Sequence, residues 1–540
     1  MAVANGTSKK IVSAALILGT ASLASRLVGL LRERVLTTTF GAGDTFDAFV
    51  AAFRLPDLIF NLVVVGALSA AFIPLFTEKL VQKNAKAEDQ AFDFANSVLN
   101  LVLIAVIVLC LLYVIFAAAL VPIITPGFSG EKLATTILLS RIMALQPLFL
   151  AMSFVVSGIL NSFKRFVAYA LAPILYNVGI IIGVLYLVPL FGVAGLGWGV
   201  VLGAALHFGI QIPSVINAGY RWRPRVMWSS GDVRKLRRMI LPRIFGLSGQ
   251  QVNLFIVTII GSTLAAGSIS VFHLANNVQS LPIGIFGIAF AQAAFPTLAE
   301  QVARKQEKQF KRTLTKTFRY ILFFVIPISI FFYLLRAQLI RVLFGAGAFD
   351  WEDTILTFET FGVLLISLFA QATIPLLARA FYVQQNTIIP VTISVISIVT
   401  NIALAIWLAP IMGIQGLALA FSLAAILNLF LLLTMLHYRL GDFDDKVVVL
   451  SLLKITVAAV LGGMVLQLLK VPVASLVDME RGWGVFVQLV VTFGAGGLTY
   501  VALCMLLKCD ELVAIRRYLP TKRDRLSPGV ETPRFEGMVD

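Results

Sequence analysis

An apolar stretch near the start of the chain, residues 19–78, contains charged side chains that could hold an anion. A charge at the centre of a membrane-spanning helix costs about 2.5–3.5 kcal/mol, so such residues usually face a bundle interior or a water-filled cavity. Arginine carries a planar fork of donors that suits phosphate oxygens, which lysine lacks. The first candidates are the charged residues of this stretch, namely Arg26, Arg32, Glu33, Arg34, Asp47, Arg54 and Asp57.

Spacing on an ideal helix predicts which of these side chains share a face. Arg26 and Glu33 are one heptad apart in the sequence, which places them on the same face. Asp47 and Arg54 have the same spacing, and Asn61 continues their stripe. Two successive helices are therefore each expected to carry a polar stripe.

Arg32 lies about 120° from Arg26 around an ideal helix, so the two can face one cavity only if the helix bends. Gly29 lies between them and is where we expect the bend. Whether Arg34 faces inward or extends to the outer headgroups stays open, because arginines near helix ends often reach the interface. Arg26 and Arg54 lie too deep for that.

The elements that must position these residues are membrane helices. The chain has 540 residues, of which 59% are hydrophobic and 13% charged, and its mean hydropathy is +0.94. This composition is typical of polytopic membrane proteins. With about 20 apolar residues per span, we expect an all-α protein whose 14 transmembrane helices lie near residues 11–38, 46–76, 93–122, 135–160, 169–187, 196–217, 239–262, 270–299, 320–335, 354–378, 390–407, 416–436, 447–469 and 483–507.

The formal net charge of +16 has two common explanations, nucleic-acid binding and the positive-inside bias of membrane proteins. With both termini in the cytoplasm, most of the 43 Lys and Arg residues fall on cytoplasmic segments, which sets the expected orientation. The basic clusters at 221–238, 304–319 and 508–525 all adjoin spans and suit anionic lipid headgroups. Nucleic acid is therefore not an expected partner.

Two stretches of the chain recur at an interval of roughly 220 residues. Residues 189–195 (PLFGVAG) recur as residues 410–416 (PIMGIQG), and residues 70–78 resemble residues 293–300. An interval that contains an even number of helices keeps both copies in the same orientation, as in parallel-repeat transporters. We therefore expect two six-helix parallel repeats followed by two extra helices.

The expected domains follow from this repeat. They are a first six-helix lobe, a cytoplasmic basic linker, a second six-helix lobe, the two extra helices and a basic tail whose composition predicts disorder. In that order they cover residues 1–217, 218–238, 239–438, 447–507 and 508–540.

The start of the second lobe is the counterpart of the charged stretch, although it is nearly uncharged. In parallel-repeat transporters the substrate site lies at the interface between repeats, so Arg243 and Asn277 are candidates for it. An amide could instead serve in interhelical hydrogen bonding, worth about 0.6 kcal/mol per contact. The complete set of predicted substrate-binding residues is Arg26, Arg32, Glu33, Asp47, Arg54, Asp57, Asn61, Arg243 and Asn277.

Several short motifs, taken together, resemble one family. They are residues 24–29 (ASRLVG), 40–43 (FGAG), 47–49 (DAF), 53–56 (FRLP), 66–74 (GALSAAFIP), 159–161 (ILN), 165–166 (RF), 172–173 (AP) and 381–382 (FY), with Arg32, Gln385 and Pro390. This set is similar to the MurJ/MviN lipid II flippases of the multidrug/oligosaccharidyl-lipid/polysaccharide exporter superfamily. The resemblance covers essentially residues 11–507.

The resemblance implies two six-helix lobes around a cavity that opens alternately to either side of the bacterial cytoplasmic membrane, with the last two helices forming a groove for a polyprenyl tail. It implies that Arg26 and Arg32 engage the pyrophosphate and sugar-peptide head of the lipid, and that Asp47 matches a family acidic position. The implied function is to move lipid II, a lipid-linked peptidoglycan precursor, from the inner to the outer leaflet. We expect a monomer.

The chain departs from the family pattern at several charged positions. Phe60 and Asn61 stand where the family usually has a basic pair, and Val65 stands where it usually has an acidic residue. Asn276 and Asn277 stand where it usually has an aspartate and an arginine. Several charges of the family pattern are therefore missing.

Two explanations of these departures are open. Arg54 and Arg243 could have taken over the anion-binding role, which is the hypothesis we favour, or the cargo could be another polyprenyl-diphosphate-linked saccharide. A drug or cation exporter of the same superfamily is a further alternative. Such an exporter should show a deep carboxylate cluster, whereas the deep charge here is mainly cationic.

Other classes of protein fit less well. A membrane enzyme would need acidic or histidine residues grouped for metal or acid-base chemistry, but His207, His273 and His437 stand alone in the sequence. No catalytic residue, metal or cofactor is expected. A scaffold that recruits partners through the tail would lose its role when the tail is deleted, whereas a flippase would not.

The sequence contains no phosphate-binding loop, so coupling to the membrane potential or to a monovalent ion is the expected energy source. Pro56 and Pro282 occupy matching places in the second and eighth helices. Alternating access predicts that these helices bend at the two prolines.

Overall fold

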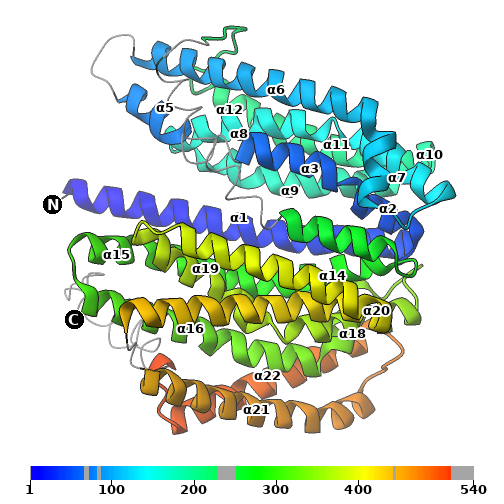
Figure 1. Ribbon diagram of the computed structural model, residues 1–540, viewed down its shortest axis with the longest axis vertical. Helices are drawn as coiled ribbons and strands as arrows, with labels where there is room; N and C mark the ends of the chain where they lie inside the picture. The colour runs from blue at the N-terminus through cyan, green and yellow to red at the C-terminus, as the bar shows by residue number, and fades with distance from the viewer. Residues whose placement is uncertain are drawn as a thin grey trace. The chain divides into compact units, whose positions relative to one another are not determined.

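The computed structural model describes residues 2–65, 72–81, 87–227, 231, 251–441 and 445–512, and for residues 2–17, 64–65 and 445 it describes the backbone alone. Within these ranges every regular element is a helix (Figure 1). Nine of the described helices are long and apolar enough to cross a membrane, or ten if the bent pair α18 (Trp351–Leu365) and α19 (Leu368–Val383) forms one span. The prediction of an all-α, multi-pass membrane protein is confirmed.

The described chain packs as two compact units. The first contains the residues up to His273 together with Leu343–Asp353, and the second contains Leu274–Val342 and the residues from Thr354 onward. The boundary therefore lies beyond the linker expected at 218–238. Residues 251–273 belong to the first unit because their polar groups bond to its second and third helices.

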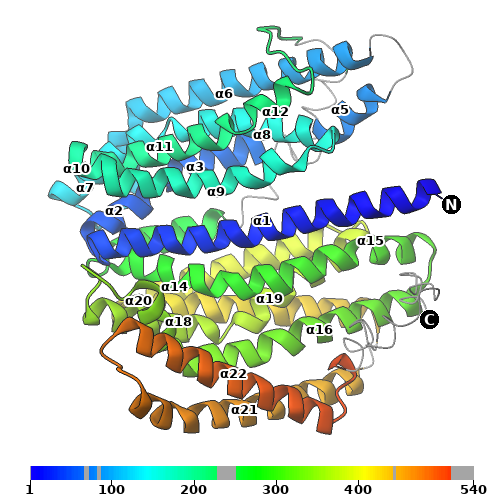
Figure 2. The same ribbon diagram turned by 180° about the vertical axis from the view of Figure 1, so that it is seen from behind.

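The first unit is built mainly on helices of membrane length and on short helices that join them. Its elements are α1 (Ala2–Phe40), α2 (Asp44–Ala52), α3 (Arg54–Phe60), η1 (Asn61–Val65), α5 (Phe72–Leu80), α6 (Ala87–Ile124), α7 (Gly130–Met143), α8 (Gln146–Ser162), α9 (Phe166–Ile182), η2 (Gly183–Leu187), α10 (Val188–Phe191), α11 (Ala194–Gly209), α12 (Ile212–Ile216) and the helix Gln251–Ser262. Helix α9 lies beside α1 (Figure 2).

The second unit has the same helical character. Its elements are η3 (Ile283–Ile288), α15 (Ala289–Ala303), α16 (Glu307–Leu334), α18, α19, α20 (Ile388–Leu440), α21 (Asp445–Leu476) and α22 (Gly482–Leu506), while α14 (Ser268–Pro282) and α17 (Arg336–Phe344) cross the boundary between the units. Helix α20 consists of two helices that meet at Gly413, where the backbone leaves the helical region.

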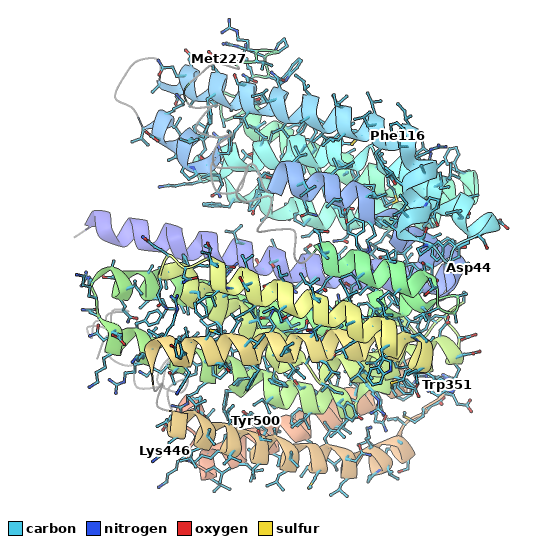
Figure 3. The ribbon with its side chains drawn as sticks, viewed as in Figure 1. Asp44, Phe116, Met227, Trp351, Lys446 and Tyr500 are labelled. Carbon is cyan, nitrogen blue, oxygen red and sulfur yellow. The ribbon has the colours of Figure 1, made fainter. Side chains whose placement is uncertain are left out.

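Large apolar side chains cover the outside of α6. Leu111, Ile115 and Phe116 are 59%, 66% and 54% exposed, and Phe116 is labelled in Figure 3. In a membrane these side chains face acyl chains, and the helix satisfies its own backbone polar groups. On its inner side α6 packs through Phe94, which stacks on Phe72 of α5.

Glycines allow α9 and α11 to approach closely. A Cβ atom on Gly179 would lie 2.3 Å from the Cα of Gly203, and a Cβ atom on Gly183 would lie 2.4 Å from the Cα of Gly199. The regular glycine spacing in α11 therefore serves helix packing, as small residues at membrane-helix interfaces commonly do.

The recurring motif has one backbone conformation in both halves. Gly192 adopts φ 60° and ψ −148°, and Gly413 adopts φ 61° and ψ −136°. Lys164 and Gln385, separated by the same interval of about 220 residues, are both left-handed, with φ of 58° and 57°. Left-handed non-glycine residues are uncommon, so their recurrence supports the duplication.

The two predicted hinge prolines each precede a π-helix. Pro56 lies in α3, which continues into η1, and Pro282 ends α14 where η3 begins. Short π-helical turns inside helices often mark functional sites. By contrast, the bend expected at Gly29 is absent: α1 runs as one continuous helix from Ala2 to Phe40 (Figure 1).

Candidate functional site

Arg26 lies on α1 with a partly buried side chain. It forms no hydrogen bond or ion pair with any residue that the structure describes. On a membrane-spanning helix an unpartnered guanidinium is costly, and its donors can hold an anionic group bidentately. Arg26 therefore remains available for an anion.

Arg32, one and a half turns further along α1, is already paired. Its guanidinium bonds to the carboxylate of Glu33, which is only 2% exposed. His273 places Nε2 3.3 Å from Oε1 of the same carboxylate. Glu33, which the spacing predicts on the same face as Arg26, therefore belongs to an Arg32–Glu33–His273 cluster, because the side chains of adjacent residues can turn toward each other.

Asp47 is fully engaged by donors from two other segments. Its Oδ2 accepts bonds from the N–H of Gly267 and from Nζ of Lys132, both at 2.8 Å. Its Oδ1 accepts bonds from the N–H and the hydroxyl of Ser270, at 2.8 and 2.7 Å. The carboxylate therefore caps the N-terminus of α14, where a negative charge is favourable. We call Asp47, Lys132, Gly267 and Ser270 the Asp47 clamp.

Lys132 joins the clamp to the start of α2. Its ammonium lies 2.7 Å from Oδ1 of Asp44, which is exposed (Figure 3), as well as 2.8 Å from the buried Asp47. It also lies 4.2 Å from the ring centre of Phe128. The cation of Lys132 therefore compensates the buried charge of Asp47.

A turn next to the clamp ties the end of α1 to residues 343–353. Gly41 is left-handed, and a Cβ atom there would lie 2.7 Å from the carbonyl oxygen of Ala348. The N–H of Ala42 donates to Asp353, and the N–H of Ala348 donates to the carbonyl of Thr38, at 2.8 and 2.9 Å. The carboxylate of Asp353 therefore accepts a backbone hydrogen bond from the turn that follows α1.

Arg54 begins α3 and donates its Nε hydrogen to the hydroxyl of Thr258 at 2.7 Å. It forms no ion pair with the part of the chain that the structure describes. Asp47 and Arg54 therefore both bond to residues 251–273, which agrees with their predicted common face. Arg54 keeps donors that a second acceptor could use.

Asp57 and Asn61 line a cavity of about 440 Å³ inside the first unit. The amide of Asn61 donates to the backbone carbonyl of Asp57 at 2.8 Å, and Nε2 of Gln146 donates to Oδ1 of Asp57 at 3.2 Å. We call this cavity the Asp57 pocket. Its lining residues are Asp57, Phe60, Asn61, Gln146, Leu150, Phe154, Ser157, Tyr169, Pro173, Tyr176 and His207.

One wall of the pocket is a chain of hydrogen bonds between α8 and the α11–α12 region. The hydroxyl of Ser157 donates to Gln211 at 2.8 Å, and the hydroxyl of Ser153 lies 2.6 Å from Nδ1 of His207. His207 stood alone in the sequence, and Gln146 carried no motif. Polar residues in apolar helices were the only signal that could have identified them.

The candidates from the start of the second lobe are Arg243 and Asn277. Arg243 lies outside the described residues. Asn277 lies on α14, in the part assigned to the second unit, and its carbonyl accepts a bond from the hydroxyl of Ser280 at 2.7 Å. Among the residues described, no three His, Cys, Asp or Glu side chains are grouped to hold a metal ion.

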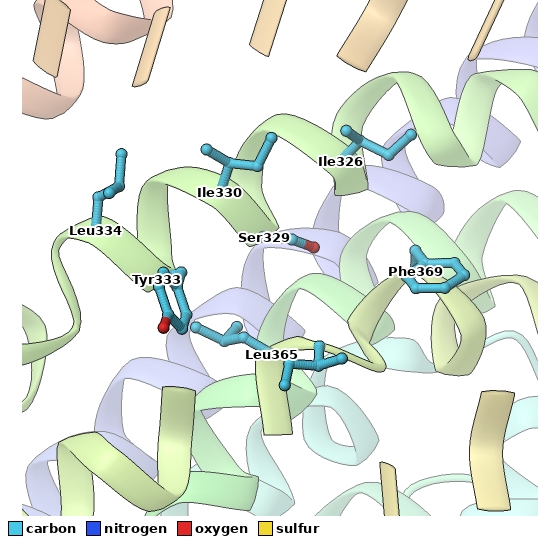
Figure 4. Close-up of a pocket in the computed structure, with 8 residues that line it drawn as sticks. Ile326, Ser329, Ile330, Tyr333, Leu334, Leu365 and Phe369 are labelled. Atoms are coloured by element: carbon cyan, nitrogen blue, oxygen red, sulfur yellow. The ribbon is translucent and has the colours of Figure 1, made fainter. Parts of the chain in front are cut away.

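A second cavity is apolar, in contrast to the polar Asp57 pocket. It lies within the second unit, has a volume of about 330 Å³ and is lined mainly by apolar side chains of α16 and of the bend between α18 and α19 (Figure 4). We call it the apolar pocket. Its lining residues are Ile326, Ser329, Ile330, Tyr333, Leu334, Leu365, Ile366 and Phe369. Helix α21 packs beside it: a Cβ atom on Gly463 would lie 3.0 Å from Leu334 and 3.1 Å from Ile330.

Comparison with known proteins finds relatives that share one name. A probable lipid II flippase MurJ of Bdellovibrio bacteriovorus is 28% identical over 516 residues, which cover 94% of this chain and 97% of that protein. A probable lipid II flippase MurJ of Vibrio cholerae is 29% identical over 443 residues, covering 80% and 84% of the two chains.

Solved structures share the fold. A lipid II flippase MurJ in an inward closed conformation has a TM-score of 0.76 at 24% identity, covering 92% of this chain and 99% of that one. An inward-facing multidrug resistance transporter of the MATE family has a TM-score of 0.63 at 14% identity, covering 78% and 96%. The family model described as lipid II flippase MurJ matches residues 36–482. On this match over most of its length, the chain belongs to the MurJ family of lipid II flippases.

Proposed function

We propose that this protein moves lipid II from the inner to the outer leaflet of the bacterial cytoplasmic membrane by alternating access. The observation that carries the proposal is the family match over residues 36–482. In addition, the guanidinium of Arg26 on the first helix has no partner among the described residues. A lipid diphosphate is an anionic group that such a guanidinium can bind bidentately.

The head group would be held by arginines that still have free donors. Arg26 has no described partner, and Arg54 uses Nε for Thr258 and keeps its terminal nitrogens. Arg32 is a weaker candidate, because Glu33 competes for its guanidinium. These assignments adopt the hypothesis that Arg54 replaces family charges missing at Phe60 and Asn61.

The polyprenyl tail would use the apolar pocket of the second unit. Its lining is aliphatic and aromatic apart from the hydroxyls of Ser329 and Tyr333, so a hydrocarbon chain gains from entering it. Helix α21 packs against the same face of α16 that carries Ile330. The extra helices would thus complete a groove for the tail, as the family resemblance implies.

The Asp47 clamp would keep the outer side of the transport path closed. With both termini in the cytoplasm, the end of α1 and the start of α2 face outward. Opening that end requires Asp47 to leave the N-terminus of α14, so the three hydrogen bonds from Gly267 and Ser270 must break together. The π-helices that follow Pro56 and Pro282 offer places where the helices can bend.

A related cargo is the second candidate. The missing charges at Phe60, Asn61 and Asn277 favour another polyprenyl-diphosphate-linked saccharide with the same anionic group and a different head. Drug or cation export is weaker, because the MATE-family likeness shows the fold alone.

A transport assay separates these possibilities. Purified protein in vesicles should flip fluorescent lipid II, and replacing the head by other polyprenyl-linked sugars should lower the rate. Equal rates for all polyprenyl diphosphates would favour the broader cargo, and no flipping of any of them would contradict the proposal.

Rescue of a flippase-depleted strain tests the arginines. We expect each of the single variants Arg26→Ala and Arg243→Ala to lose rescue. Loss of rescue by Arg26→Ala but not by Arg243→Ala would contradict the idea that Arg243 replaces a missing family charge.

A further inference from the structure

The Asp57 pocket contains a carboxylate that has few partners for its charge. We propose that this pocket binds a small monovalent cation, with Na⁺ as the ion that its oxygen groups fit. The ion would lie against the carboxylate of Asp57 and the side-chain oxygen of Gln146. The proposal deepens the proposed function by giving the coupling ion a site, and only its role in transport rests on that function.

The carboxylate itself is incompletely satisfied. The one side-chain hydrogen bond that it accepts from a described residue comes from Gln146, and at 3.2 Å this bond is at the long end of the normal range. Arg54 lies one helical turn earlier but directs its Nε hydrogen to Thr258, and it forms no ion pair with a described residue. A partly buried negative charge of this kind is stabilised by a cation that reaches it.

Gln146 provides an independent observation. Its side chain is 2% exposed, and its Oε1 is buried with no hydrogen-bond partner among the described residues. Its Nε2 is directed to Asp57, so the amide already belongs to the wall around the carboxylate. A buried amide oxygen without a donor is destabilising, and a bound cation supplies the missing positive partner.

The other lining groups select the kind of ion. Asn61, Ser157, Tyr169 and Tyr176 contribute oxygen atoms, and Asp57 is the sole acidic residue among the described residues that line the pocket. Hard cations prefer such oxygen ligands, whereas transition metals prefer thiolate and imidazole. A single carboxylate balances one positive charge, which favours a monovalent ion over Ca²⁺ or Mg²⁺.

His207 does not provide a competing site. Its Nδ1 is bonded to Ser153, and Tyr176 packs edge-on against its ring. Among the described residues that line the pocket there is no second histidine, no cysteine and no second carboxylate.

Occupancy of the pocket would be linked to anion binding. With a cation on Asp57, the attraction between this carboxylate and the neighbouring Arg54 weakens, and the guanidinium can interact more strongly with an anionic head group. By reciprocity, a bound head group would then raise the affinity for the cation.

The test measures ion binding without transport. The full-length purified protein is heated in detergent with NaCl or choline chloride at constant ionic strength, and the Tm is followed against Na⁺ concentration. We expect a saturable rise in Tm, because a ligand that binds the folded state stabilises it. Asp57→Asn should weaken the apparent Na⁺ affinity by about 10-fold or more, the effect of losing one charged ligand.

Two further variants keep the test decisive. Gln146→Met keeps the size of the side chain and removes its oxygen, so it should weaken Na⁺ affinity even if Asp57→Asn folds poorly. Asp89→Asn changes an exposed aspartate in the first turn of α6 and should keep the wild-type response.

Three results would overturn the proposal. The first is a wild-type Tm that does not change with Na⁺ concentration. The second is a Tm that depends on pH alone, which would indicate a proton at Asp57. The third is an Asp57→Asn variant with unchanged Na⁺ affinity. Failure of lipid II flipping with Na⁺ binding intact would contradict the proposed function and leave the cation site standing.

Discussion

Two aspartates on one broken helix have opposite surroundings. Asp47 on α2 is 1% exposed and accepts four hydrogen bonds, one of them from the ammonium of Lys132. Asp57 on α3 is partly exposed to a cavity and accepts one long side-chain bond. A saturated carboxylate holds segments together, whereas an unsaturated one next to a cavity can take a ligand. The comparison separates structural from binding roles among the predicted site residues.

The largest expected effect on stability comes from removing the carboxylate of the Asp47 clamp. Asp47→Ala should lower the free energy of unfolding by about 3–5 kcal/mol, because it leaves Lys132 and the N-terminus of α14 without their buried partner. Thermal unfolding in detergent measures the change. Asp44→Ala is the matched control: Asp44 is exposed, so its loss should cost about 0–1 kcal/mol. Equal losses in the two variants would contradict the distinction.

Gly267 offers a second way to break the clamp. Its φ is +85°, and a Cβ atom would lie 1.8 Å from the carbonyl oxygen of Ala42. Gly267→Ala should therefore cost about 3 kcal/mol through strain and overlap together. Gly130→Ala has a similar left-handed φ of +53° with nothing within 4 Å, so it should cost only about 1 kcal/mol. A Gly267→Ala protein as stable as Gly130→Ala would show that the approach to Ala42 is not tight.

Ser270 tests one bond of the clamp. Ser270→Ala removes the hydroxyl that donates to Asp47 at 2.7 Å and keeps the N–H bond. We expect a loss of about 1.5 kcal/mol, typical of a hydrogen bond to a charged group. The Tm of this variant should lie between those of the wild type and Asp47→Ala, and a value equal to the latter would mean that the hydroxyl alone holds the clamp.

Asp57 should show the smallest effect on stability. In Na⁺-free buffer Asp57→Asn should change the free energy of unfolding by less than about 1 kcal/mol, because asparagine keeps an oxygen for Gln146 and removes a poorly compensated charge. Chemical or thermal unfolding without Na⁺ provides the measurement. A loss of stability comparable to that of Asp47→Ala would show that Asp57 also has a structural role and would contradict the distinction between the two aspartates.

Much of the fold was predictable from the sequence because membrane helices leave a strong local signal. Apolar length predicted the membrane helices. The repeated PLFGVAG and PIMGIQG motifs predicted a duplication, and the matching backbone angles of Gly192 and Gly413 agree with it. The sequence predicted bends at Pro56 and Pro282, and in the structure a π-helix follows each of these prolines. The prediction of a bend at Gly29 was wrong, since a single glycine does not break a long helix that packs well against α9.

The site was predictable only at the level of residue type. Charges in apolar helices identified Arg26, Arg54 and the two aspartates, but spacing could not distinguish Asp47 from Asp57. Their roles depend on partners far away in the sequence, Ser270 for one and Gln146 for the other. Such partners are chosen by tertiary packing, which leaves no local pattern.

The central claim is that arginines on the first helices hold the anionic head of the cargo, and the binding of lipid II to the purified protein tests it most directly. Arg26→Ala should weaken binding by about 10-fold or more, as expected for a charge-assisted contact to a diphosphate. Arg34→Ala should leave the affinity close to the wild-type value, because the guanidinium of Arg34 already bonds to the carbonyl of Leu343. Unchanged affinity in Arg26→Ala, or an equal loss in both variants, would contradict the account.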